Sequence, residues 1–289
     1  KDSIMHHISK FNTYFKKNIS KIKVNEKKYI KLAKQCYEII SSPMHTHDLP
    51  GRLEISKYFR KHECKVFFSA DGCDELLGGQ QIYEKIYKKN YDLEINQSPY
   101  STIINKLTNN DSLEDYKIFL DNKWKNTFKK YAFIESKKDR NIQSSLFLDY
   151  FIQSVSVGNR VNDLISCNNS VEPRNAFISK NILKIIINLP LKYKINFQEK
   201  NKNFKQKYIL KKIFCKYFDE SLLFPKQGFS GFPGSLIKDK NFPLTENVIS
   251  SKLSKFYNNK KYYDFSNLKR DYDWKFTNTE NFLKIFFKN

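Results

Sequence analysis

The residues best suited to chemistry lie in one short stretch, residues 69–79, which reads S-A-D-G-C-D-E-L-L-G-G. It carries three carboxylates, Asp71, Asp74 and Glu75, and Gly72 permits a tight chain reversal between them. One carboxylate is enough to cap a helix, whereas Mg²⁺ with a polyphosphate requires clustered carboxylates. For Glu75, helix capping explains the residue as well as a functional role does.

Two later stretches place charges in unusual settings. Glu172 and Arg174 lie two residues apart before an apolar helical segment, and a structural ion pair between them is a fair interpretation. Lys226 is the one charged residue of a loop rich in glycine and aromatic residues, residues 224–234. A solvated surface explains this lysine poorly, and a fixed cation beside developing phosphate or oxyanion charge is the functional alternative.

The elements around the acidic stretch predict a sheet covered by helices. Residues 19–24 alternate as a half-buried strand does, helical spacing follows over 26–40 and 53–60, and a nearly continuous apolar strand is predicted at 64–69. Ligands bind at the carboxyl ends of strands in such α/β sheets. Beyond residue 79 we expect no strand, and the predicted helices are 80–88, 113–130, 145–163, 178–188 and 205–218.

Composition excludes several classes of protein. The 289 residues carry a net charge of +22, yet only six of the 52 basic residues are Arg and the lysines are scattered, so a nucleic-acid partner is the weakest interpretation. The longest apolar stretch, 182–191, contains Lys184 and Pro190 and is far shorter than the roughly 20 residues of a membrane span. Five dispersed cysteines indicate reduced thiols, and we expect a cytoplasmic protein without a membrane association.

Four motifs in register resemble the synthetase region of glutamine-hydrolysing asparagine synthetases, of the N-type ATP pyrophosphatase superfamily. Residues 69–79 are similar to the family's S-G-x-G-x-D-E-hydrophobic-x-G-G, and residues 170–177 to S-x-E-x-R-x-P-F. Residues 207–211 match K-x-x-L-[RK], and 225–229 reproduce P-K-Q-G-F. The resemblance implies one domain over 1–289. Its fold would be α/β, with a partial parallel sheet of the adenine-nucleotide α-hydrolase type over 1–80 and a mainly helical part over 81–289.

The resemblance also implies roles for the acidic stretch. ATP would contact Ser69, Ala70 and Gly72, and Asp74 would help to hold Mg²⁺ and pyrophosphate. Asp71 matches the acidic position that orients or deprotonates the attacking ammonia.

Residues outside that stretch receive roles in the same way. Lys226 would stabilise charge at the reacting phosphate and acyl centres, and Lys207 would lie near the nucleotide phosphates. Asp163 falls on the acid of the family's R-V-D-R-M-S-M-A segment, with one residue inserted after Val161 and the following Arg replaced by Leu164. Three residues would support the site: Glu75, Glu172 and Arg174.

The implied reaction activates the side-chain carboxylate of aspartate, or of a related substrate, with ATP, and ammonia derived from glutamine completes the amide. The chain departs from the family at Ala70, Pro173 and Ala176, and it contains no match to the S-G-G-x-D-S phosphate loop or to the glutaminase cysteine. We therefore expect it to be the carboxy-terminal part of a longer enzyme, with the glutaminase domain or ammonia source elsewhere. By itself it is expected not to make asparagine.

Two other functions stay open at this point. A remnant that has lost its phosphate loop would serve as a partner-binding module, and an amidotransferase of the same type would act on a different carboxylate.

Overall fold

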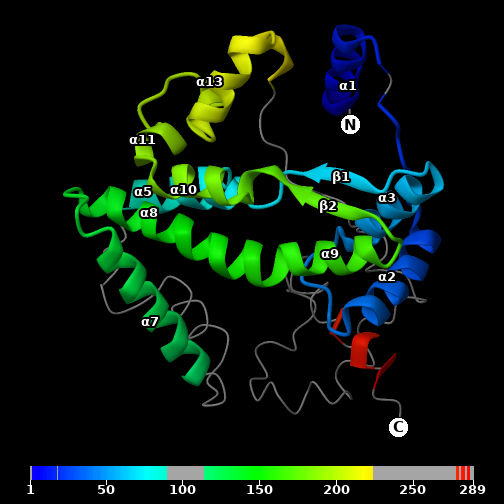
Figure 1. Ribbon diagram of the computed structural model, residues 1–289. Coiled ribbons are helices and arrows are strands. Elements are labelled where there is room, and N and C mark those ends of the chain that lie inside the picture. The colour runs from blue at the N-terminus through cyan, green and yellow to red at the C-terminus, as the bar shows by residue number, and fades with distance from the viewer. Residues whose placement is uncertain are drawn as a thin grey trace, which may run out of the picture. The chain divides into compact units, whose positions relative to one another are not determined.

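The computed structural model describes residues 2–17, 19–89, 114–223, 278–279, 281–283 and 285–286 (Figure 1). Two short strands, β1 (Val66–Ser69) and β2 (Glu172–Asn175), pair in a small parallel sheet, and most of the other described residues are helical. This arrangement confirms the α/β class. None of the described helices combines the length with the hydropathy that a bilayer span requires.

The chain divides into two compact units, and each draws on separated parts of the sequence. The first comprises Lys1–Ser20, Phe68–Asn159 and Asn175–Gln227, and the second comprises Lys21–Phe67, Arg160–Arg174 and Gly228–Asn289. The single domain expected over 1–289, with its division at residue 80, stays a prediction.

The second unit contains three mutually packed helices: α2 (Glu26–Ile40), α3 (Leu49–Lys61) and α9 (Arg160–Cys167). α2 has the bounds that its apolar spacing predicts, because Asn25 caps its first turn by accepting a hydrogen bond from the Lys28 N–H at 2.9 Å. Its apolar stripe is buried, with Cys36 fully enclosed, and burial raises the pKa of that thiol to about 12. Cys36 is therefore a core residue and no nucleophile.

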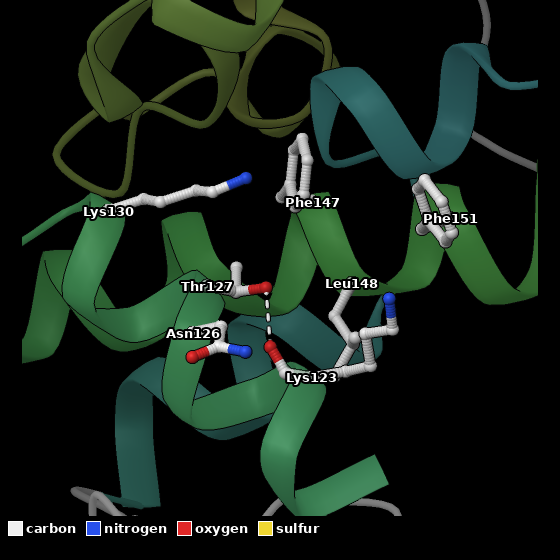
Figure 2. A pocket seen from close by; sticks show the side chains of 7 residues that line it. All are labelled: Lys123, Asn126, Thr127, Lys130, Phe147, Leu148 and Phe151. Carbon is white, nitrogen blue, oxygen red and sulfur yellow. Dashed lines mark hydrogen bonds between the residues drawn. The ribbon is translucent and has the colours of Figure 1, made fainter. Parts of the chain in front are cut away.

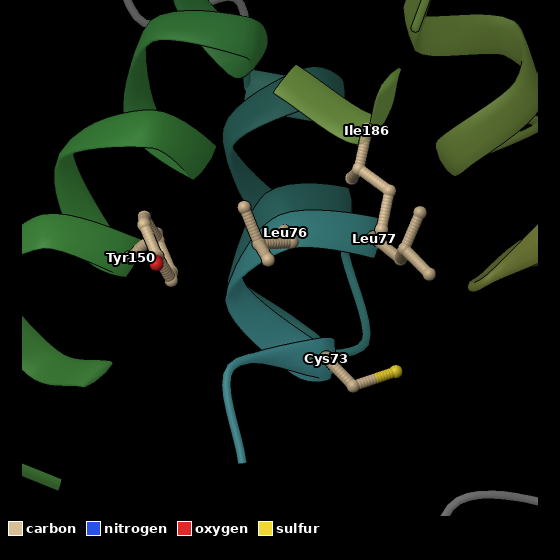
Figure 3. Packing of buried hydrophobic residues seen from close by; sticks show 5 residues of the cluster. All are labelled: Cys73, Leu76, Leu77, Tyr150 and Ile186. Carbon is tan, nitrogen blue, oxygen red and sulfur yellow. The ribbon is translucent and has the colours of Figure 1, made fainter. Parts of the chain in front are cut away.

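The first unit holds the remaining described helices, except those at the chain's end. They are α1 (Asp2–Phe15), α4 (Cys73–Leu77), α5 (Ile82–Lys89), α7 (Glu114–Lys130), α8 (Lys137–Asp149), η2 (Tyr150–Asn159), η3 (Ala176–Ile178), α10 (Lys180–Asn188), α11 (Leu191–Lys194), α12 (Lys202–Lys205), α13 (Tyr208–Tyr217) and η4 (Glu220–Leu222). The short α4 is the centre of one apolar cluster: Leu76 points toward Tyr150, and Leu77 lies beside Ile186 (Figure 3).

The predicted helix over 145–163 is part of a longer helical stretch that runs from residue 137 to 167. Its middle, η2, is a π-helix of ten residues, Tyr150–Asn159. A π-helix changes the hydrogen-bond spacing while keeping a helical path, so the apolar periodicity alone does not reveal it. Such segments are uncommon and occur frequently at functional sites.

Three expectations about strands and helices are wrong. Residues 19–24 form no strand, because no described segment pairs with them. Strand β2 was not expected, since Glu172–Asn175 contains Pro173 and no large apolar residue; it forms because the Glu172 N–H donates to the Lys65 carbonyl at 2.8 Å. Helix α1 was also missed, although Ile4, Ile8, Phe11 and Phe15 recur at helical spacing.

Strand β1 is less buried than its apolar sequence predicts. Phe67 stacks on Phe59 of α3 at 5.1 Å between ring centroids, but Phe68 on the opposite face is 83% exposed. Only β2 pairs with β1 among the described strands. The carboxyl end of β1 nevertheless leads directly into the acidic stretch.

Candidate active site

The turn after β1 is fixed by hydrogen bonds between its own residues. The Ser69 hydroxyl donates to the Asp71 carboxylate at 2.7 Å, and the Asp71 backbone N–H donates to the Ser69 oxygen at 3.3 Å. The Cys73 N–H donates to the Ala70 carbonyl at 3.1 Å. These contacts hold the half-buried Asp71 carboxylate at the carboxyl end of the strand, and the ligand-binding role of the turn stays a prediction.

Gly72 is required at the start of α4 for two reasons. Its φ of +84° lies in the left-handed region, which side-chain-bearing residues rarely adopt. A methyl group there would also lie 3.0 Å from Ile178 Cγ2 and 3.0 Å from the Ser154 oxygen. Because Ser154 belongs to η2, the π-helix packs directly beneath the turn.

Helix α4 places its two acids away from the apolar cluster. Cys73, Leu76 and Leu77 are buried, whereas Asp74 and Glu75 are half-buried on the other side. The Gln80 side chain donates to Glu75 at 2.9 Å. Glu75 thus has a local structural partner, but α4 has no side-chain cap, and the supporting role of Glu75 stays a prediction.

Asp74 forms an ion pair with Lys207, a residue distant in the sequence. The Lys207 N–H donates to the Leu77 carbonyl at 3.2 Å, which ties the start of α13 to the end of α4. Burial by itself would lower the pKa of Lys207, but Cys73 and the Asp74 carboxylate outweigh it and raise this pKa. Gly79 makes room for the pair: a methyl group there would lie 2.2 Å from Asp74 Oδ1 and 2.4 Å from Lys207 Cε.

A second lysine, in the first turn of α13, accompanies the pair. The Lys211 ammonium donates to the Asn203 carbonyl, and burial, followed by the neighbouring Lys207 charge, lowers its pKa. Two lysines near one carboxylate form a cationic group that is suited to a polyphosphate. The K-x-x-L-[RK] spacing contains both lysines, although only Lys207 was predicted as a site residue.

Sequence reasoning missed a buried acid close to the turn. The Tyr83 hydroxyl donates to Asp149 Oδ2 at 2.6 Å, and both side chains are buried. Burial raises the pKa of Asp149 to about 7; the Tyr83 hydrogen bond lowers it and the Glu75 charge raises it further. An aspartate inside the apolar run L-F-L-D-Y-F was the available signal.

Three predicted site residues belong to the second compact unit. Asp163 lies on α9, where it accepts a hydrogen bond from the Cys167 thiol at 3.4 Å. Arg174 donates to Glu172 at 2.9 Å, and both side chains are at least half exposed. The Glu–Arg pair that the sequence suggested is present, while its role in bracing a site stays a prediction.

Lys226 and the rest of its glycine-rich loop lie outside the described residues, so its role also stays a prediction. Within the described part of the chain, no group of three or more His, Cys, Asp or Glu side chains has a metal-binding arrangement. Mg²⁺ bound with a polyphosphate needs only one or two protein carboxylates, because phosphate oxygens and waters supply the other ligands. Asp74 fits that requirement.

The turn at the end of β1 thus brings three carboxylates and two lysines together in an α/β protein. The family model described as asparagine synthase matches residues 6–281, which is nearly the whole chain, so the chain belongs to the asparagine synthase family. It is therefore a ligase of a family that forms amides at the expense of ATP. No curated protein and no solved structure matches it significantly.

Proposed function

We propose that this chain carries the synthetase chemistry of asparagine formation: aspartate, ATP and ammonia yield asparagine, AMP and pyrophosphate. The observation that carries the proposal is the arrangement at the end of β1: Asp71 lies in the turn, and Asp74 of α4 pairs with Lys207, the residue that precedes α13. The first half-reaction needs a lysine and a metal-binding carboxylate beside the phosphates, and the second needs a carboxylate that accepts a proton.

In the first half-reaction, an oxygen of the aspartate side chain attacks the α-phosphorus of ATP and pyrophosphate leaves. Lys207 and Lys211 would offset the charge on the phosphates, and Lys226 is proposed to do so at the reacting centre. Asp74 would hold Mg²⁺, which supplies further neutralisation of the polyphosphate when it is bound. Ser69, Ala70 and Gly72 would contact the nucleotide through the turn.

In the second half-reaction, the nitrogen of ammonia attacks the acyl carbon and AMP leaves. Asp71 would accept the proton that the attacking nitrogen loses, and its hydrogen bond from Ser69 keeps the carboxylate in place for this step. We also propose that Asp163, Glu75, Glu172 and Arg174 support the site. A glutaminase domain that hydrolyses glutamine, or another source of ammonia, would supply the ammonia.

The test is aspartate-dependent release of pyrophosphate from ATP. It is measured with ammonium chloride as the nitrogen source, both on the 289-residue chain and on the product of its complete reading frame. We expect release from the complete product, loss of release in its Asp74→Ala variant, and retention in a Glu84→Gln variant as the control. Absence of release from both proteins would refute the proposal.

A substrate series separates aspartate from other acceptors. Replacing aspartate by glutamate or by peptide and sugar acids is expected to abolish pyrophosphate release. Faster release with one of these acids than with aspartate would refute the assignment of aspartate and identify an amidotransferase for a different carboxylate. A chain that fails even to bind ATP would instead fit the partner-binding remnant.

A further inference from the structure

An open groove lies in the first unit, between helix α7 and the helix that continues from α8 into η2 (Figure 2). Its volume is about 460 Å³, within the range of pockets that hold small organic ligands. The side chains that line it are Lys123, Asn126, Thr127, Lys130, Phe147, Leu148 and Phe151. None of the residues proposed for the ligase reaction is among them.

One wall of the groove is cationic. Lys123, Asn126, Thr127 and Lys130 are spaced as i, i+3, i+4 and i+7, so they share one face of α7. The Thr127 hydroxyl already donates to the Lys123 carbonyl at 2.8 Å. The two ammonium groups and the Asn126 amide are therefore the donors that this wall offers to a ligand.

The opposite wall is aromatic. Phe147 and Phe151 stack on each other with ring centroids 6.5 Å apart and an interplanar angle of 28°, and Leu148 is buried beside them. Phe151 is 46% exposed although its ring is large and apolar. It is the second residue of the π-helix, so its exposure coincides with the irregular part of the helix.

The lysine side chains extend over this aromatic wall. The Lys130 ammonium lies 5.5 Å from the centre of the Phe147 ring. The Lys123 ammonium lies between two rings, 5.7 Å from the centre of Phe151 and 5.4 Å from that of Phe119 on its own helix.

In the described part of the chain, no acidic residue lines the groove. Lysines also lie over aromatic rings elsewhere in the described residues, such as Lys138 over Tyr87 and Lys212 over Phe204. The groove differs because two lysines share a hollow with a stacked ring pair, and its described lining includes no carboxylate.

We propose that this groove binds a small organic anion with a flat apolar ring system. The ring would lie against Phe147 and Phe151, and the negative group of the ligand would form ion pairs with the ammonium groups of Lys123 and Lys130. The flat body and the charge are both needed, because the rings offer apolar surface and the lysines offer charge on the facing wall. Aromatic carboxylates and nucleoside monophosphates share this chemistry.

The probe for the experiment is 1-anilinonaphthalene-8-sulfonate, an aromatic anion whose fluorescence rises in apolar surroundings. Titration of the 289-residue chain is expected to give saturable binding that weakens as salt is added. In Lys123→Gln/Lys130→Gln, Kd should rise at least tenfold, and in Phe151→Ala the fluorescence of the bound probe should fall.

Matched controls keep these results specific. Lys125→Gln/Lys129→Gln removes two exposed charges from the same helix outside the groove, and Kd is expected to stay within twofold. Lys207→Gln tests whether the probe reports the candidate active site, and it should also leave Kd unchanged. An equal loss of affinity in the control double variant, or no loss in Lys123→Gln/Lys130→Gln, would overturn the proposal.

Competition then separates the two sources of ligand. Displacement of the probe by 2-naphthoate at lower concentration than by AMP points to an aromatic carboxylate, and the reverse order points to a nucleotide. N-phenyl-1-naphthylamine, which keeps the rings without the sulfonate, should bind at least tenfold more weakly than the probe. Displacement by inorganic phosphate as effective as that by either aromatic anion would overturn the need for a ring.

Discussion

The acidic turn and the groove beside α7 lie in the same compact unit, yet their charged residues have different surroundings. At the turn, Asp71 accepts a hydrogen bond from Ser69, and Asp74 is paired with Lys207. In the groove, Lys123 and Lys130 lie over aromatic rings, with no carboxylate among the described lining residues.

This difference has a physical consequence. Groups that are already held by protein partners need little reorganisation when a reaction develops charge, which is what a catalytic site requires. When a charge is not neutralised by the protein, binding of a ligand of opposite charge lowers the free energy, which is what a binding site requires. Changes at the turn should therefore affect chemistry and stability, whereas changes in the groove should affect binding alone.

The largest effect is expected for Asp74→Ala. Removing this carboxylate leaves Lys207 without its ion-pair partner and removes the proposed magnesium ligand, so kcat/KM for aspartate-dependent pyrophosphate release should fall about 1000-fold. In Asp74→Asn, kcat/KM should fall nearly as far, because the asparagine amide carries no charge. A loss of less than tenfold in steady-state assays of the complete product would contradict a role at the reacting phosphates.

A change of stability with pH is expected from Asp149. Burial raises its pKa to about 7, so the folded state binds more protons than the unfolded state between about pH 4 and pH 7, and stability is lost as pH rises through that window. Asp149→Asn removes this dependence. Its unfolding free energy relative to wild type should therefore increase by on the order of 3 kcal/mol from pH 4.5 to pH 8 in urea titrations.

Tyr83→Phe supplies the control for that measurement. The Tyr83 hydroxyl stabilises the ionised form of Asp149, so its removal should move the pH-dependent loss of stability to higher pH. An Asp149→Asn variant whose stability parallels wild type at every pH would show that the buried carboxyl does not titrate in this range.

Two glycine substitutions should separate backbone strain from loss of the ion pair. Gly72→Ala forces a left-handed conformation on alanine and crowds Ile178 and Ser154, so unfolding should become easier by about 2 kcal/mol. Gly79→Ala meets only the ends of the flexible Asp74 and Lys207 side chains, and should cost about 1 kcal/mol or less. It should nevertheless slow pyrophosphate release, because the added methyl group displaces that pair.

The smallest effect on stability is expected in the groove. Lys123→Gln/Lys130→Gln removes exposed charges that rest on Phe147 and Phe151, and such contacts contribute about 0.5 kcal/mol each at exposed sites. Thermal unfolding should therefore stay within about 1 kcal/mol of wild type while probe affinity falls at least tenfold. A large destabilisation would show that these lysines stabilise the fold, and it would contradict the expectation that changes in the groove affect binding alone.

The turn was predictable because its information is local. The strand that ends at Ser69 and the glycine that reverses the chain depend on neighbouring residues, and the structure has both where the sequence predicts them. The short helix α4 was not among the predicted helices. The helix over 26–40 was equally readable, since its apolar stripe and its Asn25 cap agree. Strand β2 was not readable, because its pairing with β1 overrides a sequence that contains a proline.

What the sequence determined by itself is the family, the acidic turn and the residue types available for chemistry. Only the tertiary structure decided which of those residues meet: Asp74 with Lys207, Tyr83 with Asp149, and the lysines of α7 with the aromatic rings of the neighbouring helix. The physical reason is that backbone preferences act over a few residues, whereas contacts between distant side chains depend on how helices pack and on where a π-helix turns a side chain outward.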